Sequence, residues 1–425
     1  MKISRYIEQV QIDDETKLIY NPIDKQYFRY KKLDESKIKG LLQNLNKGVY
    51  SKQEIEILKE LINKKIVLSD KADEFDEMMF KENQIRYESD TFHIMIIVTN
   101  GCNFRCLYCI QEHESIALSN ESASRILKLI ENKVNEVKKV KITWFGGEPL
   151  LQYKRIKEIM EKAIEIGEKY NCQIEAAMVS NGYLLNEEII LDLKKLNFNM
   201  LQITVDGDKN THDKRRFLAN GDGTYNVILQ NVQMIVKNNI PLLLRINVDE
   251  TNFENAYSLL EEIPKEYRYN VMISVSNLYQ ATKKISPYKI YKKSIEMGYA
   301  YKRRKNVFMA CQTCLMNGIM IDATGKLIVC ANAKNEDKNL GYIDDNGKII
   351  IQNSSLYYKL KTVSALHNPE CRKCKELPLC IATCKYRRSI NNETCIGKRN
   401  DGLTIEEYAK LDYYDDRRKF YGNTK

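Results

Sequence analysis

Between residues 90 and 303 the chain alternates short apolar runs with longer segments whose apolar residues recur at helical spacing. The apolar runs predict six strands, at 93–99, 140–145, 173–180, 200–205, 241–248 and 270–276. The segments between them predict helices near 121–138, 153–169, 186–196, 223–238, 252–263 and 286–302. Six strand–helix units joined by short links indicate an α/β fold with a parallel sheet and right-handed crossovers. In such a sheet, functional groups gather where the strands end.

Residues 1–88 follow a different pattern and contain no cysteine. Three alternating stretches predict a hairpin of three strands, at 3–10, 15–22 and 26–31. Two helical stretches follow, one opening at Leu33 and one at the capping box of Ser51 and Glu54, and Ile66 begins a last short strand. A three-stranded hairpin with two or three helices predicts a winged-helix-like domain.

Composition narrows the class of protein. The 425 residues are 43% hydrophobic and 29% charged, which predicts a soluble chain of two or three domains. No apolar stretch approaches the ~20 residues that a membrane-spanning helix needs, so we expect no membrane contact. The start at Met1 has no apolar signal core, which predicts a cytoplasmic location. The net charge of +10 is dispersed among acidic residues, so no nucleic-acid partner is expected.

The twelve cysteines fall into groups that suit metal clusters better than disulfides, which are rare in the cytoplasm. One group has the spacing C-x3-C-x2-C and consists of Cys102, Cys106 and Cys109. A second group of eight crowds the end of the chain, at Cys311, Cys314, Cys330, Cys371, Cys374, Cys380, Cys384 and Cys395. Cys172 is left over, and we expect it to be a small buried hydrophobic residue.

The first group directly follows the apolar run that ends at Val98. Iron–sulfur clusters usually take four thiolates, so three cysteines leave one iron of a cubane cluster open. The loop from Cys102 to Cys109 closely resembles the cluster loop of the radical SAM superfamily. That resemblance implies a 4Fe-4S cluster whose open iron binds S-adenosylmethionine (SAM) and whose electron yields a 5′-deoxyadenosyl radical. It also implies a partial (β/α)6 barrel.

Motifs at the ends of the next strands strengthen this resemblance. The second strand ends in a GGEP turn, which in the family holds the SAM amino group. The third ends in Ser180 and Asn181, a turn similar to one that lines the SAM pocket. With Tyr108 of the cluster loop, the resemblance therefore implies SAM contacts from Gly146, Gly147, Glu148, Pro149, Ser180 and Asn181.

The fourth strand ends in Thr204-Val-Asp-Gly, followed by a segment that resembles the family's H-x3-R. By this resemblance Thr204 bonds the ribose and Arg216 pairs with the SAM carboxylate; adjacent Arg215 is the alternative. His212 is either a proton carrier or a brace for the loop. No catalytic residue is assigned. On the fifth strand, Asn247 either faces the pocket or serves packing.

The cysteines after residue 305 resemble the pattern of the SPASM domain, which carries iron–sulfur clusters. A hairpin turn is expected at Ala323-Thr-Gly-Lys, between Cys314 and Cys330. The resemblance assigns to a first auxiliary cluster Cys311, Cys314, Cys330 and Cys384. It assigns to a second one Cys371, Cys374, Cys380 and Cys395. With the SAM-binding cluster, this makes three 4Fe-4S clusters; a pair of zinc sites is the alternative. A charged helix is expected from Leu403 to Phe420.

The resemblance implies three domains: a winged-helix-like leader-recognition domain at 1–88, a radical SAM barrel at 89–304 and a SPASM domain at 305–425. Most SPASM enzymes modify ribosomally made peptides. We therefore predict a peptide maturase that draws electrons from a flavodoxin or ferredoxin. Its N-terminal unit either binds the leader of a precursor peptide by strand addition, or is a structural cap on the barrel or a degenerate copy that binds no leader. The predicted reaction is an oxidative crosslink, most simply a cysteine thioether.

Other activities stay open. Carbon–carbon coupling and epimerisation are neighbouring reactions of the same family. A sulfatase-maturing enzyme is disfavoured because Ala331 stands where those relatives have an aspartate base. An RNA-modifying enzyme would need an RNA-binding module, and none is recognised. A non-enzymatic metal scaffold would leave the SAM motifs without a purpose.

Overall fold

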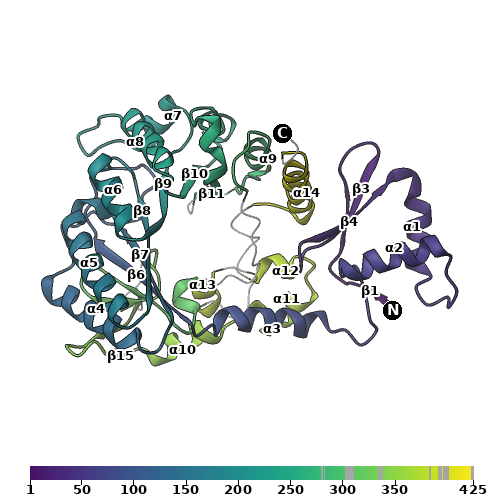
Figure 1. Cartoon of the computed structure of the whole chain (residues 1–425), viewed down its shortest axis with the longest axis horizontal. Helices are drawn as coiled ribbons and strands as arrows, with labels where there is room; N and C mark the ends of the chain where they lie inside the picture. Colours follow the sequence, from purple (N-terminus) through teal and green to yellow (C-terminus); the bar gives the residue numbers. More distant parts are fainter. Residues whose placement is uncertain are drawn as a thin grey trace.

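The computed structural model describes residues 1–278, 281, 283–301, 311–333, 338–381, 384–390, 395 and 402–422. Its centre is a sheet in which six parallel strands stand in chain order (Figure 1). They are β6 (Thr91–Thr99), β7 (Lys139–Gly146), β8 (Gln173–Ser180), β9 (Phe198–Thr204), β10 (Leu242–Val248) and β11 (Val271–Asn277). The six predicted strands are confirmed to within two residues at each end, because long apolar runs bounded by polar turns leave little choice of position.

Helices connect these strands along one side of the sheet (Figure 1). They are α4 (Asn120–Lys133), α5 (Tyr153–Lys169), α6 (Glu187–Lys195), α7 (Lys209–Arg215) and α8 (Tyr225–Lys237); α9 (Tyr288–Glu296) follows β11. The helix predicted over 252–263 is wrong: two short 3-10 turns replace it, at Phe253–Asn255 and Ser258–Glu261, and a third follows at Lys265–Asn270. Pro264 disfavours helical geometry at the residue before it. Likewise α9 ends earlier than predicted, at Glu296, two residues before Gly298 with its positive φ of 91°. The predicted domain boundary near 304 lies outside the described residues.

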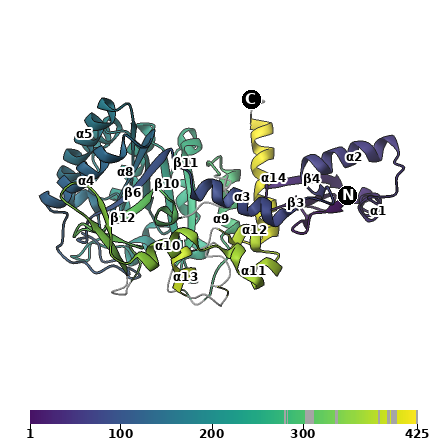
Figure 2. The same cartoon turned by 90° about the horizontal axis from the view of Figure 1, so that it is seen from below.

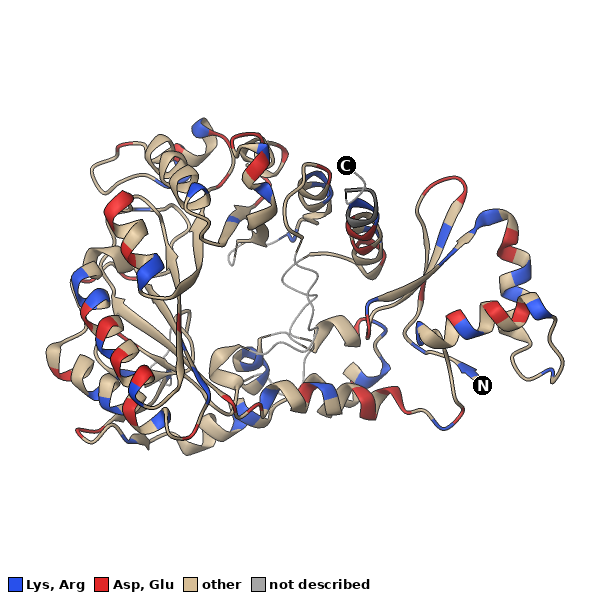
Figure 3. Ribbon diagram, in the orientation of Figure 1, with Lys and Arg blue, Asp and Glu red and all other residues tan. Residues whose placement is uncertain are grey.

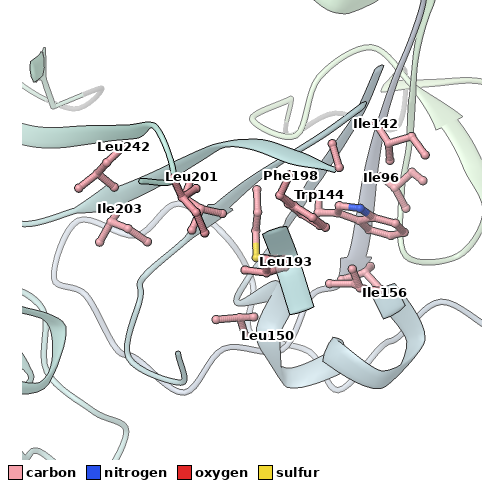
Figure 4. Packing of buried hydrophobic residues seen from close by; sticks show 14 of the residues in the cluster. Ile96, Ile142, Trp144, Leu150, Ile156, Leu193, Phe198, Leu201, Ile203 and Leu242 are labelled. Atoms are coloured by element: carbon pink, nitrogen blue, oxygen red, sulfur yellow. The ribbon is translucent and has the colours of Figure 1, made fainter. Parts of the chain in front are cut away.

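The face of the sheet toward these helices forms the main core. Every second residue of each strand is buried there, and Cys172 joins this core as predicted. Trp144 of β7 is fully buried and packs beside Ile96, Ile142 and Ile156 (Figure 4). The alternate residues point to the opposite face, which we call the inner face. Most of them are only half-buried.

Four further strands extend the sheet beyond β6. They are β12 (Gly318–Ile321), β13 (Lys326–Ile328), β14 (Asn339–Ile343) and β15 (Ile349–Ile351). β12 runs parallel to β6, while the others pair antiparallel. The predicted hairpin turn is confirmed, with Gly325 at a φ of 84° that a side chain rarely adopts. The attachment to β6 was not predicted, because a short strand carries no signal of its distant partner.

The N-terminal unit contains two small sheets and lies apart from the main sheet (Figures 1 and 2). One sheet pairs β1 (Lys2–Ile3) with β5 (Val67–Leu68). The other has the order β2 (Glu8–Gln11), β3 (Thr16–Asn21), β4 (Gln26–Lys31). The strand predicted over 3–10 is therefore divided between two sheets. Helices α1 (Glu35–Gln43) and α2 (Lys52–Asn63) complete the unit, and the capping box of α2 is confirmed.

Helix α3 (Glu74–Arg86) joins this unit to the rest and was not located by the sequence pattern. Its buried Glu82 and Arg86 form an ion pair, and Lys385 and Ser364 from the end of the chain bond the same carboxylate. The C-terminal helices are α10 (Ser354–Thr362), α11 (Pro369–Lys373), α12 (Leu377–Cys380), α13 (Lys385–Ile390) and α14 (Ile405–Gly422). The ion-pair network thus ties residues before 88 to this helical region.

Helix α14 packs against the N-terminal sheet (Figure 2). The Tyr20 hydroxyl donates to Asp412 at 2.8 Å, and the Tyr27 hydroxyl donates to Asp416 at 3.0 Å. The predicted terminal helix and its packing are confirmed. Positive and negative side chains alternate along the outer helices (Figure 3), as the dispersed net charge predicts. Among the described helices, none has the length and apolar character needed to cross a bilayer.

Candidate active site

The loop that carries the first three cysteines follows β6 and is held by main-chain hydrogen bonds. The Arg105 N–H donates to the Phe217 carbonyl at 2.9 Å, and the Leu107 N–H donates to the Arg215 carbonyl at 3.0 Å. Phe104 is buried beneath the loop. The structure therefore fastens the cluster loop to the segment that follows α7, where the predicted SAM arginine lies.

The two glycines of the GGEP turn let the end of β7 approach the cluster loop. A Cβ on Gly146 would lie 2.4 Å from the Thr99 carbonyl oxygen, and one on Gly147 would lie 2.3 Å from that of Gly101. The Gly147 and Glu148 N–H groups donate to these same carbonyls, each at 2.9 Å. The sequence suggested that these glycines let the backbone approach a ligand. In the structure they are required by the backbone of the cluster loop.

Glu148 joins the ends of β7 and β8. Its carboxylate is completely buried and accepts from the Ser180 hydroxyl at 2.7 Å, the Asn181 N–H at 2.7 Å and the Leu150 N–H at 3.0 Å. Burial raises the pKa of Glu148, although these donors oppose the shift. The Asn181 amide also donates to Asn103 of the cluster loop at 2.8 Å. Pro149 begins the next turn and is buried beside them.

The Tyr108 hydroxyl is the centre of a polar network above β9 and β10. It donates to the Asp206 carboxylate at 2.5 Å and accepts from Arg216 at 2.7 Å and from the Asn247 amide at 3.0 Å. Asn247 therefore faces this network, which decides between its two predicted roles. Burial raises the pKa of Tyr108, so the hydroxyl keeps its proton at neutral pH. Thr204 is buried at the end of β9, in register with Arg245.

The two adjacent arginines have different partners. Arg215 forms ion pairs with Asp249 at 2.8 Å and with Asp206 at 3.5 Å. Arg216 has no ion pair with any described residue; it bonds Tyr108 and lies over the Phe104 ring at 5.7 Å. Its Nε is buried without a hydrogen-bond acceptor among the described atoms. Arg216 is therefore the guanidinium of the two that can take an incoming carboxylate.

His212 braces the loop that carries Arg216. Its Nδ1 accepts from the Asp206 N–H at 3.2 Å, and its Nε2–H donates to the Thr224 hydroxyl at 3.0 Å. Thr224 in turn donates to the Arg216 carbonyl at 2.6 Å. Burial lowers the pKa of His212 to about 3, so the ring is neutral near pH 7. Of its two predicted roles, the geometry supports the brace.

The loop before β12 carries Cys311 and Cys314. The Cys311 and Cys314 thiols are hydrogen-bonded, and this bond lowers the pKa of Cys311 to about 6. Cys330 lies within electrostatic reach of Cys311 and Cys384. Gln312 lies between Cys311 and Cys314 in the chain, and its side-chain amide donates to the Thr143 hydroxyl on the inner face of β7 at 3.0 Å. The structure thus places Cys311 beside Cys314, next to the main sheet, and leaves the assignment of a first auxiliary cluster a prediction.

Lys361 of α10 is a buried cation beside these thiols. Its ammonium donates to the Leu315 carbonyl at 2.5 Å and the Gly318 carbonyl at 2.7 Å. It has no ion pair with a carboxylate among the described residues, and Cys311 and Cys314 supply its negative surroundings. Burying an unpaired ammonium is costly, so the position favours an anionic group at the thiols. A cluster bound by four thiolates carries negative charge and fits this site.

The remaining cysteines lie in and near the short helices α11 and α12. Cys371 and Cys374 flank the end of α11, and Cys380 ends α12. Arg388 donates to the Cys371 sulfur at 3.6 Å. Cys395 is exposed, and most residues around it lie outside the described part of the chain. Among the described residues, no group of three His, Cys, Asp or Glu side chains is already arranged around a metal position.

Sequence reasoning missed several residues of the site. Asp249 follows the end of β10, so the rule about strand ends could have identified it. Asp206 was noticed only as part of a motif, although it bonds Tyr108 and Arg215. Lys361 gave no signal, because lysine on a helix usually points to solvent and only packing shows that this one does not.

The arrangement of this fold and site is that of a radical SAM enzyme. The family model described as Radical SAM superfamily matches residues 96–263, so this segment is a radical SAM domain. It contains the cluster loop, the GGEP turn and the polar network of Tyr108. The predicted enzyme class is confirmed.

Relatives of known name include a maturase, a synthase and several GTP 3',8-cyclases. A cysteine-type anaerobic sulfatase-maturating enzyme of Clostridium novyi is 21% identical over 355 residues, 74% of this chain and 92% of that protein. The radical SAM cyclopropyl synthase TigE of Paramaledivibacter caminithermalis is 23% identical over 90% of this chain and 89% of its own. The crystal structure of Streptococcus suis SuiB bound to precursor peptide SuiA matches with a TM-score of 0.51 and 13% identity, over 92% of this chain and 97% of that one.

Proposed function

We propose that this enzyme matures a ribosomally made precursor peptide and binds the peptide's leader with its N-terminal unit. The observation that carries the proposal is an open sheet edge in that unit, in a chain that aligns along 92% of its length with a structure bound to a precursor peptide. An extended peptide can add a strand to such an edge.

The sheet has two edge strands, β2 and β4; α14 packs against β2, and β4 is the edge we propose for the leader. The Lys32 N–H donates to the Glu15 carbonyl across the sheet. In antiparallel strands alternate residues face the partner, so the N–H groups of Tyr27, Arg29 and Lys31 point away from β3. A cleft of about 440 Å³ runs beside this strand, between the sheet and helices α1 and α2. Its apolar lining includes Phe28, Tyr30, Ile38 and Ile57. The cleft offers pockets for side chains of an added strand.

The proposed cofactor contacts are those that the family resemblance implies, and the geometry around Arg216 supports one of them. Arg216 holds the SAM carboxylate, and Thr204 bonds the ribose. The turns after β7 and β8 and the aromatic ring of the cluster loop enclose the rest, through Tyr108, Gly146, Gly147, Glu148, Pro149, Ser180 and Asn181. Cys102, Cys106 and Cys109 hold the first cluster, and the eight later cysteines hold two more. When bound, the first cluster and SAM supply a radical that removes a hydrogen atom from the substrate. A flavodoxin or ferredoxin in the cytoplasm supplies the electron.

The reaction that this arrangement favours is an oxidative crosslink, most simply between a cysteine sulfur and a carbon of the peptide. The substrate loses one hydrogen atom, one proton and one electron as the bond closes, and an auxiliary cluster is the acceptor of that electron. The Gln312–Thr143 contact supports an acceptor close to the inner face of the sheet. Carbon–carbon coupling has the same electron balance. Epimerisation forms no crosslink: one C–H bond is broken and a new one forms on the opposite face, with a hydrogen atom supplied by a thiol.

The Clostridium novyi relative favours a second candidate, a sulfatase-type maturase that oxidises a cysteine side chain. The alignment with this relative covers 74% of this chain, whereas the alignment with TigE covers 90%. Ala331 also provides no carboxylate at the position after Cys330. We therefore place peptide crosslinking first.

The test uses full-length enzyme, reconstituted anaerobically, and a precursor peptide encoded beside its gene. Ile57→Glu places a charge in the cleft beside β4 and should raise the KM for the leader-bearing peptide at least about tenfold, because an apolar contact is replaced by a buried charge. Ile62→Glu on the same helix is the matched control, since Ile62 is 46% exposed. Reductant-driven SAM cleavage without peptide checks the folding of both variants.

Mass spectrometry of the product then decides the reaction. A loss of two hydrogens with a cysteine that resists alkylation supports the thioether. The same loss with alkylatable cysteines indicates carbon–carbon coupling, and deuterium gained from solvent without other mass change indicates epimerisation. Equal KM values for Ile57→Glu and the control would refute leader binding at β4.

A further inference from the structure

A third arginine stands near the Tyr108 network, on the inner face of the sheet. Arg245 lies on β10 between Leu244 and Ile246, which are buried in the core on the opposite face. It is in register with Thr204 of β9 and Ser274 of β11. Its Nε donates to the Asn247 side chain at 2.9 Å. Because strand residues alternate in direction, Arg245 points to the same side as Asn247, about 6–7 Å further from the strand end.

The charges near Tyr108 leave two guanidinium groups unpaired. Asp206 and Asp249 form ion pairs with Arg215. Neither Arg216 nor Arg245 forms an ion pair with a described residue. SAM carries one carboxylate, and by the proposed function Arg216 takes it. Arg245 is therefore available to a second anion.

The environment of the Arg245 side chain also favours binding of an anion. Its pKa is lowered because burial outweighs the attraction of Tyr108 and Asp206, and Arg216 adds repulsion. The pKa of Arg215 is raised instead, as expected where carboxylates surround a guanidinium. A cation held without a partner in a half-buried position costs free energy, which an incoming anion can recover. A guanidinium matches a carboxylate in shape and takes it through two hydrogen bonds.

We propose that Arg245 binds a carboxylate of the substrate peptide, either an acidic side chain or the C-terminal carboxylate, and so sets which residue lies near the radical. This inference rests on the proposed function for the identity of the substrate as a peptide. The carboxylate site itself is defined by the residues of β10. A peptide held by both β4 and Arg245 is fixed at two points, at the leader and at the segment to be modified.

The experiment measures binding of small probes to full-length, cluster-loaded enzyme in the presence of SAM. Calorimetric titrations use N-acetyl-Gly-Glu-Gly-amide, its Gln counterpart and N-acetyl-Gly-Gly-Gly with a free C-terminus. We expect a carboxylate probe to bind at least about tenfold more tightly than the Gln probe, which equals ~1.4 kcal/mol. Preference for the Glu probe indicates a side chain as the ligand, and preference for the free acid indicates the C-terminus.

Variants assign the effect to Arg245. Arg245→Gln should abolish the preference, Arg245→Lys should keep part of it, and the surface substitution Arg155→Gln should leave it intact. Equal binding of all probes to the unaltered enzyme, or a preference that persists in Arg245→Gln, would overturn the proposal. If Arg245→Gln does not fold, Arg245→Lys is measured instead. A preference for carboxylate probes equal to that of the unaltered enzyme, together with weaker SAM binding, would also overturn the proposal.

SAM affinity separates this site from the cofactor site. If Arg245→Gln weakens SAM binding as much as Arg216→Gln does, Arg245 is a cofactor ligand and the proposal is wrong. Failure of the proposed function has a different signature. In that case the precursor peptide shows no mass change, while the Arg245-dependent preference for carboxylate probes persists.

Discussion

Replacing Arg216 by glutamine tests the centre of the cofactor site. Glutamine can still bond the Tyr108 hydroxyl, but it has no charge for the SAM carboxylate. A hydrogen bond to a charged group contributes ~1.5–3 kcal/mol. The loss corresponds to a rise in the Kd for SAM of about 10- to 150-fold. Binding can be measured by titration of the reduced enzyme with SAM, followed by the change in the cluster's electron paramagnetic resonance signal.

Arg215→Gln is the matched control, because this neighbour is already paired with Asp249 and Asp206. Its removal leaves Asp206, which is completely buried, without that cation. We therefore expect Arg215→Gln to lower the free energy of unfolding by about 1–3 kcal/mol. Its effect on SAM affinity should be smaller than that of Arg216→Gln. If Arg215→Gln proves the costlier change for SAM, the assignment is displaced by one residue and the reasoning from ion pairs fails.

Three further predictions concern the clusters and the brace. Replacing Cys102, Cys106 and Cys109 together by alanine should lower the iron content from about twelve to about eight per chain, measured after reconstitution; stoichiometric zinc instead would refute the three-cluster assignment. Lys361→Met should lower the midpoint potential of an auxiliary cluster in a redox titration, because a nearby cation stabilises the reduced form; an unchanged potential would show that Lys361 serves packing only. His212 has a folded pKa below its unfolded value, so it makes the protein less stable as pH falls from about 6.5 toward 3. Chemical denaturation of His212→Gln should show a flatter pH dependence in that window.

Local patterns in the sequence determined the central sheet. Six apolar runs of strand length, each bounded by polar turns, could only be buried as parallel strands with helices between them. The cluster loop was equally clear, because cysteine spacing is a property of neighbouring residues. The error over 252–263 arose where aromatic residues at helical spacing met Pro264, which ends helical geometry before a full helix can form.

Tertiary structure alone decided which side chains meet. The sequence could not show that β12 joins β6, that α3 sends Glu82 and Arg86 among the C-terminal helices, or that β4 is left open at the sheet edge. Such contacts join residues up to several hundred positions apart, and no local propensity encodes them. The same holds for charge: the sequence does not show which of Arg215, Arg216 and Arg245 is paired. In the described part of the chain, only Arg215 lies within ion-pair distance of Asp206 and Asp249. The sequence therefore determined which reactive and charged side chains the protein has. The packing of the chain determined which of them lie close enough to pair.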